Sequence, residues 1–246
     1  MTHSLIIGGT RGLGRVIVRQ FSEAGHAVTV LGRRAPPPAD ETIGNVKHVI
    51  ADLREQATIE KAIADAVAAC GPLNYIVFCQ RFRGEGDAWA GEIEVSLNAT
   101  RRVIDLATPL FATEGDRAIV VVSSVFGHYV GEGQPASYHV GKAGLDHLAR
   151  FHAVNLGRKG IRVNIVTPFT FLKEESRDFY LGNEPLHELY RKITPLGRMA
   201  TTEDSANVVS FFCSPKSSFV NGQNIVVDGG LSLMWPETIA RQLTAL

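Results

Sequence analysis

The stretch Leu5-Ile6-Ile7-Gly8-Gly9-Thr10-Arg11-Gly12-Leu13-Gly14 decides the fold of this 246-residue chain. Its three leading apolar residues predict a buried strand, and the glycines after them predict a tight turn. Leu13, Ile17 and Phe21 then recur at helical spacing. Backbone amides at the start of a helix point at anions, and glycines let a phosphate approach the main chain. The stretch therefore predicts a strand, turn and helix that hold a pyrophosphate, rather than a turn that binds nothing.

The rest of the chain continues the alternation of short apolar runs and helical patterns. Ile59, Ile63 and Val67, for example, share one face of a predicted helix. Alternating strands and helices imply a parallel sheet with right-handed crossovers. We therefore expect an α/β fold, with a single doubly wound (Rossmann-type) domain over residues 1–246 and a seven-stranded parallel sheet flanked by helices. The predicted strands are 5–7, 27–31, 46–50, 75–79, 118–123, 162–166 and 224–227.

Two segments interrupt the alternation. Residues 34–38 read Arg-Ala-Pro-Pro-Pro, which cannot form the interior of a helix and predicts a stiff loop after the second strand. Residues 169–195 are rich in aromatic side chains and lack clean periodicity. Connections of this length are usually functional or disordered, so we interpret residues 169–195 as a substrate lid within the single domain.

Composition excludes several classes of partner. Lys and Arg total 25, as do Asp and Glu, so no global field favours nucleic acid or an anionic membrane. The three cysteines are widely spaced without a metal-ligand pattern, which predicts free thiols in a reducing compartment and no metal. The sequence contains no targeting segment and no apolar run of membrane-spanning length. We therefore expect a cytoplasmic protein.

Further motifs accompany the glycine turn. They are Asp52-Leu53, Asn98, Ser123-Ser124, Tyr138-xxx-Lys142, Val163-Asn164 before Pro168, Pro195-Leu196-Gly197-Arg198-Met199, and the ending from Val220-Asn221-Gly222 to Asp228-Gly229-Gly230. In combination they make the chain resemble the short-chain dehydrogenases/reductases, in the single-domain branch that includes 3-oxoacyl-carrier-protein reductases. The resemblance covers nearly the whole chain. It implies a nicotinamide cofactor, a small carbonyl substrate and a homo-oligomer, a tetramer.

The end of the second strand predicts which cofactor is used. An NAD enzyme needs an acid there to bind the ribose hydroxyls, but the place is taken by Gly32, followed by Arg33 and Arg34. Guanidinium groups match a 2′-phosphate in charge and geometry, and Arg11 can reach the same phosphate, so we expect NADP(H). The alternative is that these arginines are solvated surface charge. The expected cofactor-binding residues are Gly8, Thr10, Arg11, Gly12, Leu13, Gly14, Arg33, Arg34, Asp52, Leu53, Cys79, Gln80, Tyr138, Lys142, Pro168, Phe169 and Thr170.

Tyr138 and Lys142 are four residues apart and share a helix face. A free tyrosine has a pKa near 10, and a nearby ammonium favours its phenolate form, so such a pair suits proton transfer at neutral pH. Ser124 follows the fifth strand, where open α/β sheets bind ligands, and is expected to hydrogen-bond the substrate carbonyl. The resemblance implies that Lys142 also holds the nicotinamide ribose and that Asn98 fixes a water for proton relay. The expected catalytic set is Asn98, Ser124, Tyr138 and Lys142.

Two motifs depart from the family's pattern. The usual Asn-Asn-Ala-Gly after the fourth strand is Phe78-Cys79-Gln80-Arg81, and the usual Pro-Gly after the sixth is Pro168-Phe169. These changes bear on the substrate, and acyl thioesters, sugar-derived ketones and aromatic ketones all stay compatible. The leading hypothesis is an NADPH-dependent carbonyl reductase with Tyr138 as general acid. The alternatives are a regulatory protein that binds NADP(H) without turnover, and a cofactor-independent relative such as a halohydrin dehalogenase, with Phe169 filling the nicotinamide space.

Arg81 and Arg83 follow the fourth strand at the carboxyl edge of the predicted sheet. If the strand continued, alternation would place both side chains on the same side. They are candidates to bind an anionic part of the substrate. The alternative is solvated loop charge, or pairing with Glu85 and Asp87.

Overall fold

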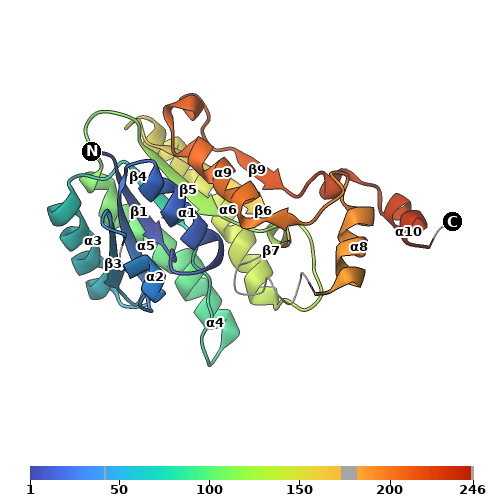
Figure 1. The fold of residues 1–246 in the computed structure, drawn as a ribbon. Coiled ribbons are helices and arrows are strands. Elements are labelled where there is room, and N and C mark those ends of the chain that lie inside the picture. The colour runs from blue at the N-terminus through green and yellow to red at the C-terminus, as the bar shows by residue number, and fades with distance from the viewer. Residues whose placement is uncertain (42, 173–181, 245–246) are drawn as a thin grey trace.

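The computed structural model describes residues 1–41, 43–172 and 182–244, and it has three layers, with helices on both faces of a parallel sheet (Figure 1). The main sheet contains β1 (His3–Ile7), β2 (Ala27–Gly32), β3 (Val46–Ile50), β4 (Tyr75–Phe78), β5 (Ala118–Val122), β6 (Arg162–Pro168) and β9 (Asn224–Val227). The helices are α1 (Gly12–Glu23), α2 (Pro38–Glu41), α3 (Gln56–Cys70), α4 (Ala88–Glu92), α5 (Ala99–Ala107), α6 (Ala136–Gly157), α8 (Glu184–Ile193), α9 (Thr202–Phe212) and α10 (Pro236–Thr244). A short parallel pair joins β7 (Phe171–Leu172) to β8 (Ala200–Thr201).

The strand order in the main sheet is β3-β2-β1-β4-β5-β6-β9. The chain runs outward from β1 to β3 on one side and then returns to β4 on the other side of β1. Open α/β sheets bind ligands outside the carboxyl ends of their strands at such a reversal. The seven predicted strands and the doubly wound fold are confirmed. The ends of β3 and β9 match the prediction, those of β2, β4 and β5 differ by one residue, and those of β1 and β6 differ by two.

Alternate residues of each strand enter two separate hydrophobic cores. In β1, Leu5 and Ile7 pack in the core that includes α3, α5 and the second half of α6, whereas Ile6 packs in the core beneath α1 and α9. All three side chains are fully buried. Because helices cover both faces, the strands need no polar face, which explains their continuous apolar runs.

The segment after β2 forms a loop that leads into a short helix. Pro38 is the first residue of α2, a position where its missing N–H costs no helical hydrogen bond. The predicted stiff loop therefore ends one residue earlier than expected. Buried Asp40 pairs with Arg15 and Arg19 of α1, and these ion pairs anchor the loop against the first helix.

The expectation that residues 169–195 lack periodicity is wrong for their C-terminal third. Residues 173–181 of the predicted lid lie outside the described residues, but α8 forms after them, with the Asn183 side chain accepting a hydrogen bond from the Leu186 amide as its N-cap. Asn183 followed by Pro185 is a helix-start signal that the sequence contained. In Figure 1, α8 and α10 lie together beyond the carboxyl ends of β6 and β9, away from the body of the sheet.

Candidate active site

The glycine turn between β1 and α1 lies directly against the end of β4. Gly8 has a φ of +82°, and a Cβ on it would meet the Gln80 amide nitrogen at 2.9 Å. A Cβ on Gly14 would meet the Gly8 carbonyl oxygen at 2.4 Å. Side chains would therefore fill the space in which the turn folds back on itself. The N-cap residue Arg11 makes no side-chain cap, so the start of α1 presents backbone amides, as an anion-binding turn requires.

Thr10 links this turn to the end of β2. A Cβ on Gly32 would lie 3.4 Å from the Thr10 Cγ2, so the end of β2 is in contact with the turn. The observation fits a dinucleotide that runs from the turn across the end of β2.

A cleft of about 630 Å³ opens beside β2 and β3. Its lining residues are Arg33, Arg34, Ile50, Asp52, Arg83, Gly84 and Glu85. Arg33 donates from Nη2 to the Arg83 carbonyl oxygen at 3.1 Å, which brings the two loops together over the cleft. Three guanidinium groups on one cleft suit a phosphorylated ribose in charge.

Asp52 and Leu53 close the far side of this region. The Asp52 carboxylate accepts hydrogen bonds from Arg54, and these hold the pKa of Asp52 below its ordinary value. Leu53 is buried in the α3/α5 core, and its carbonyl oxygen accepts from Arg102. Asp52 therefore lines the cleft as an ionised, paired carboxylate, whereas the side chain of Leu53 belongs to the core.

Ser124, Tyr138 and Lys142 gather at the carboxyl end of β5. Ser124 caps the short 3-10 helix η3 (Val125–Gly127), its hydroxyl accepting from the Phe126 amide at 3.3 Å. A Cβ on Gly127 would touch the Lys142 backbone, so η3 packs closely on α6. Lys142 is 4% exposed, and its Nζ donates to the Val122 carbonyl oxygen at 2.9 Å. The Lys142 Nζ lies 5.7 Å from the centre of the Tyr138 ring.

The side chain of Asn98 makes its hydrogen bond outside the group of Ser124, Tyr138 and Lys142. It ends the π-helix η1 (Ile93–Asn98) and donates from Nδ2 to Glu94 at 2.6 Å. Glu94 is also paired with Arg102, whose guanidinium reaches the Leu53 carbonyl oxygen. Asn98 is thus joined through Glu94 and Arg102 to the loop that precedes α3, and its role in proton relay stays a prediction.

The residues that replace the family's usual fourth-strand ending are tightly held. The Gln80 amide donates to the Thr100 hydroxyl at 2.8 Å inside the fold. Burial raises the pKa of the Cys79 thiol to about 12, so this thiol is protonated at neutral pH. All three cysteines are free, as predicted.

Arg81 and Arg83 do not share a side, because the fourth strand does not continue to them. β4 ends at Phe78, and the partly buried Phe82 packs against the α3/α5 core, where a Cβ on Gly91 of α4 would meet its ring at 2.4 Å. Arg81 consequently reaches Tyr138, with its guanidinium carbon 4.5 Å from the ring centre, while Arg83 reaches the cleft beside β2. The sequence contained Phe82 between the two arginines, but which way its ring turns depends on the core.

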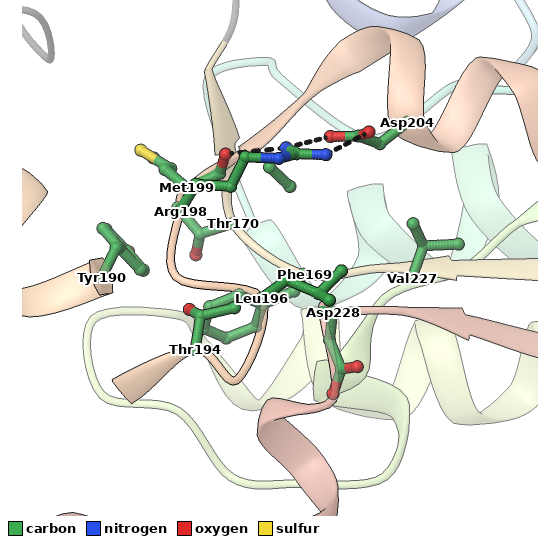
Figure 2. A pocket seen from close by; sticks show the side chains of 12 residues that line it. Phe169, Thr170, Tyr190, Thr194, Leu196, Arg198, Met199, Asp204, Val227 and Asp228 are labelled. Atoms are coloured by element: carbon green, nitrogen blue, oxygen red, sulfur yellow. Dashed lines mark hydrogen bonds and ion pairs between the residues drawn. The ribbon is translucent and has the colours of Figure 1, made fainter. Parts of the chain in front are cut away.

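A second pocket, shown in Figure 2, lies beyond the ends of β6 and β9. It contains about 160 Å³ and is lined by Phe169 and Thr170 together with Tyr190 of α8 and Leu196. Arg198 closes it with two hydrogen bonds to Asp204, which hold the pKa of Asp204 at about 2. Pro168 pairs in register with Val227 of β9.

This pocket shares none of its lining residues with the Ser124, Tyr138 and Lys142 cluster. The Phe169 and Tyr190 rings meet edge to face at 6.1 Å within it. Residues 168–170 therefore form a separate wall at the same edge of the sheet. Their contact with α8 was not visible from the sequence, because the helix itself was missed.

Two histidines near Tyr138 have structural contacts. The His139 ring accepts from the Gly131 amide through Nε2 and binds the Pro135 carbonyl oxygen through Nδ1, both at 3.0 Å. These bonds fix the loop that leads into α6. His128 lies 3.0 Å from buried Asp146.

A buried carboxylate beside α6 was not among the residues predicted from the sequence. Glu92 is buried, accepts a hydrogen bond from Ser96, and lies against Gly141, next to Lys142. An acidic residue in an otherwise apolar stretch of a helix was the available signal. Within the residues that the structure describes, no three His, Cys, Asp or Glu side chains are grouped as metal ligands, and no helix is both long and apolar enough to cross a membrane.

A parallel sheet in this order, with a glycine-rich turn beside a basic cleft, is typical of a dinucleotide-binding fold. Residues 8–232 match the family model described as Enoyl-(Acyl carrier protein) reductase. The chain belongs to the short-chain dehydrogenase/reductase family, whose members are oxidoreductases that use a nicotinamide cofactor.

Individual relatives align along almost the whole chain. The 3-oxoacyl-[acyl-carrier-protein] reductase FabG of Staphylococcus aureus is 30% identical, over 94% of this chain and 98% of its own. An uncharacterized oxidoreductase of Schizosaccharomyces pombe is 28% identical, over 92% of this chain and 89% of its own. The structure of a short-chain type dehydrogenase/reductase from Mycobacterium ulcerans has a TM-score of 0.82 at 26% identity, covering 94% of this chain and 90% of that one.

Proposed function

We propose that this protein reduces a ketone to a secondary alcohol with NADPH. The observation that carries the proposal is the grouping of Ser124, Tyr138 and Lys142 at the carboxyl end of β5, where a sheet of this order binds its ligand. The glycine turn that would hold the cofactor's pyrophosphate is two strands away. The names of the relatives support reductase chemistry, because one of them is a 3-oxoacyl reductase.

Each residue of the group has a distinct task in this proposal. The Tyr138 hydroxyl gives its proton to the carbonyl oxygen, while Ser124 donates a hydrogen bond that orients this oxygen. Lys142 supplies the positive charge that favours the tyrosinate left after proton transfer. When bound, the nicotinamide supplies the hydride to the carbonyl carbon. The ketone thus gains a hydride and a proton, and NADPH becomes NADP⁺.

Selection of NADPH over NADH rests on the arginine-lined cleft. Arg33 and Arg34 line it at the end of β2, and no acid occupies that strand end. Of the two acidic residues that line the cleft, Asp52 and Glu85, Asp52 is engaged by Arg54. A 2′-phosphate would therefore meet guanidinium groups, and the ribose hydroxyls of NADH would find no acceptor at Gly32.

The test is a carbonyl panel followed by loss of NADPH absorbance. We expect turnover with at least one ketone, and we expect Tyr138→Phe to lower kcat by roughly 100-fold or more, because general acid catalysis contributes about 10²–10⁴. Cofactor binding by Tyr138→Phe, followed by NADPH fluorescence, should stay near that of the wild type. Normal turnover in this variant would contradict the mechanism, and NADPH binding without turnover of any ketone would favour a regulatory protein.

We further propose a homo-oligomer, a tetramer by resemblance to the family. Phe151 and Val154 are exposed on α6, and Ile225 and Val226 of β9 are partly exposed. Exposed apolar side chains of this size on regular elements are typical of subunit contacts. Light scattering gives the subunit number, and Val154→Glu should lower it.

A further inference from the structure

Arg81 lies on the ring face of the proposed proton donor. Its guanidinium carbon is 4.5 Å from the centre of the Tyr138 ring, within the range of a cation–π contact. Phe82 fixes this direction, because its ring is packed between the core and α4. Phe82, the next residue in the chain, thus holds Arg81 beside the Tyr138 ring.

The charge of Arg81 has no acidic partner among the described residues. Among the described residues, Arg81 donates a hydrogen bond to the neutral Gln134 side chain, from Nη2 to Oε1 at 3.4 Å. Its Nε is buried and makes no hydrogen bond to the described part of the protein. A guanidinium is always charged and has five donors, and the described part of the protein leaves the Nη donors of Arg81 largely unused.

From this geometry we propose that Arg81 binds a carboxylate of the substrate, so that the substrate is an oxo acid with its carboxylate close to the ketone. The proposal rests on the proposed function, because it places the ketone at Tyr138. A guanidinium on the ring of the proton donor can reach only groups a few bonds away from the carbonyl oxygen. Its planar donor fork matches a carboxylate with two parallel hydrogen bonds.

Arg83 has a different environment and does not share this role. It lies in the cleft with Arg33 and Arg34, on the side proposed for the cofactor's phosphate. Among the described residues, Arg81 is the arginine beside the Tyr138 ring, and a carboxylate balances its single charge. This separation of two arginines only two residues apart makes the substrate assignment specific to Arg81.

The experiment compares oxo acids with their methyl esters, which keep the ketone and lose the charge. The pairs are pyruvate, acetoacetate and levulinate with methyl pyruvate, methyl acetoacetate and methyl levulinate. We expect the wild type to prefer the acid in the 2-oxo or 3-oxo pair. Arg81→Gln should raise KM for that acid by roughly 10- to 150-fold, the range of a charge-assisted hydrogen bond, and leave the ester nearly unchanged.

Two further variants make the comparison specific. Arg81→Lys keeps the charge without the planar fork, so its KM for the acid should lie between those of wild type and Arg81→Gln. Arg158→Gln removes an exposed arginine at the C-cap of α6, the end of the helix remote from Tyr138, and should leave both substrates unaffected. Thermal unfolding of each variant shows whether it is folded.

Equal losses with the acid and the ester would overturn the proposal, because Arg81 would then act through Tyr138. A higher kcat/KM with dihydroxyacetone phosphate than with any oxo acid would overturn the carboxylate assignment.

A binding measurement separates this proposal from the proposed function. By calorimetry, 3-hydroxybutyrate should bind the NADPH complex, which cannot react with it, more tightly than its methyl ester, and Arg81→Gln should abolish the difference. Equal binding of acid and ester by the wild type would contradict the role of Arg81 even if no ketone were turned over.

Discussion

The Lys142 ammonium and the Val122 carbonyl oxygen join α6 to the sheet by a hydrogen bond of 2.9 Å. Val122 is the last residue of β5, and Ser124 follows two positions later. The side chain that is proposed to supply charge beside Tyr138 therefore also fixes α6 against the strand that positions Ser124. Under the proposed mechanism, loss of the ammonium should affect both the chemistry and the packing.

Lys142→Met should lower kcat by roughly 100-fold or more and weaken NADPH binding. It should also lower the free energy of unfolding by about 1–3 kcal/mol, because a buried carbonyl loses a charged donor. Kinetics, NADPH fluorescence and urea unfolding measure the three effects. Tyr138→Phe is the matched control, since it keeps the ammonium and should keep wild-type stability. Unchanged NADPH affinity in Lys142→Met would remove the proposed ribose contact.

Arg33→Ala should weaken NADPH binding by roughly 10- to 150-fold and leave NADH binding almost unchanged. The physical reason is that Arg33 lines the cleft where the 2′-phosphate is proposed to lie. Fluorescence titrations with both cofactors check the result. Arg158→Ala, at an exposed position on the C-cap of α6, is the control. If NADPH and NADH weaken equally, Arg33 holds its loop against Arg83 instead of binding the phosphate.

Gly14→Ala should destabilise the fold by about 1–3 kcal/mol and abolish measurable NADPH binding. The new Cβ would lie 2.4 Å from the Gly8 carbonyl oxygen, so the turn must shift. Gly44→Ala is the control, because no atom lies within 4 Å of a Cβ there and its φ is not in the left-handed region. Unfolding curves and cofactor titrations should show wild-type values for the control. Normal cofactor binding by Gly14→Ala would contradict the proposed pyrophosphate site.

Acidification should destabilise the protein partly through His3. Its imidazole is fully buried between the Gly71 carbonyl oxygen and the Thr29 hydroxyl, and burial holds its pKa below the ordinary value of 6.5. The unfolded chain therefore binds a proton below about pH 6.5 that the folded protein excludes. The stabilising contribution is complete above that pH and is lost as the pH falls.

Urea unfolding at pH 7.5 and pH 5.5 measures this loss. In His3→Gln the decrease in unfolding free energy between the two pH values should be smaller than in the wild type, although not absent, because burial also lowers the pKa of His26 and His152. His147→Gln changes an exposed histidine and should keep the wild-type decrease. An identical decrease in His3→Gln and wild type would show that His3 is protonated in the fold.

Local sequence determined the sheet, the first helices and the family. Most of the seven strands are apolar runs, although edge strand β3 contains Lys47 and His48. A run such as Leu5-Ile6-Ile7 is buried on both faces in a parallel sheet covered by helices. The tight turn after β1 could also be predicted from its glycines, because backbone geometry at Gly8 and Gly14 leaves no room for a side chain.

Tertiary structure alone decided which side chains meet. Arg81 and Arg83 look equivalent in sequence, but the burial of Phe82 turns one toward Tyr138 and the other toward the cleft beside β2. Asn98 and Lys142 both belong to the predicted catalytic set, and only the structure shows that Asn98 is bonded to Glu94 and Lys142 to Val122. The direction in which each of these side chains points depends on packing between elements that are distant in the chain, and no pattern within a single element encodes it.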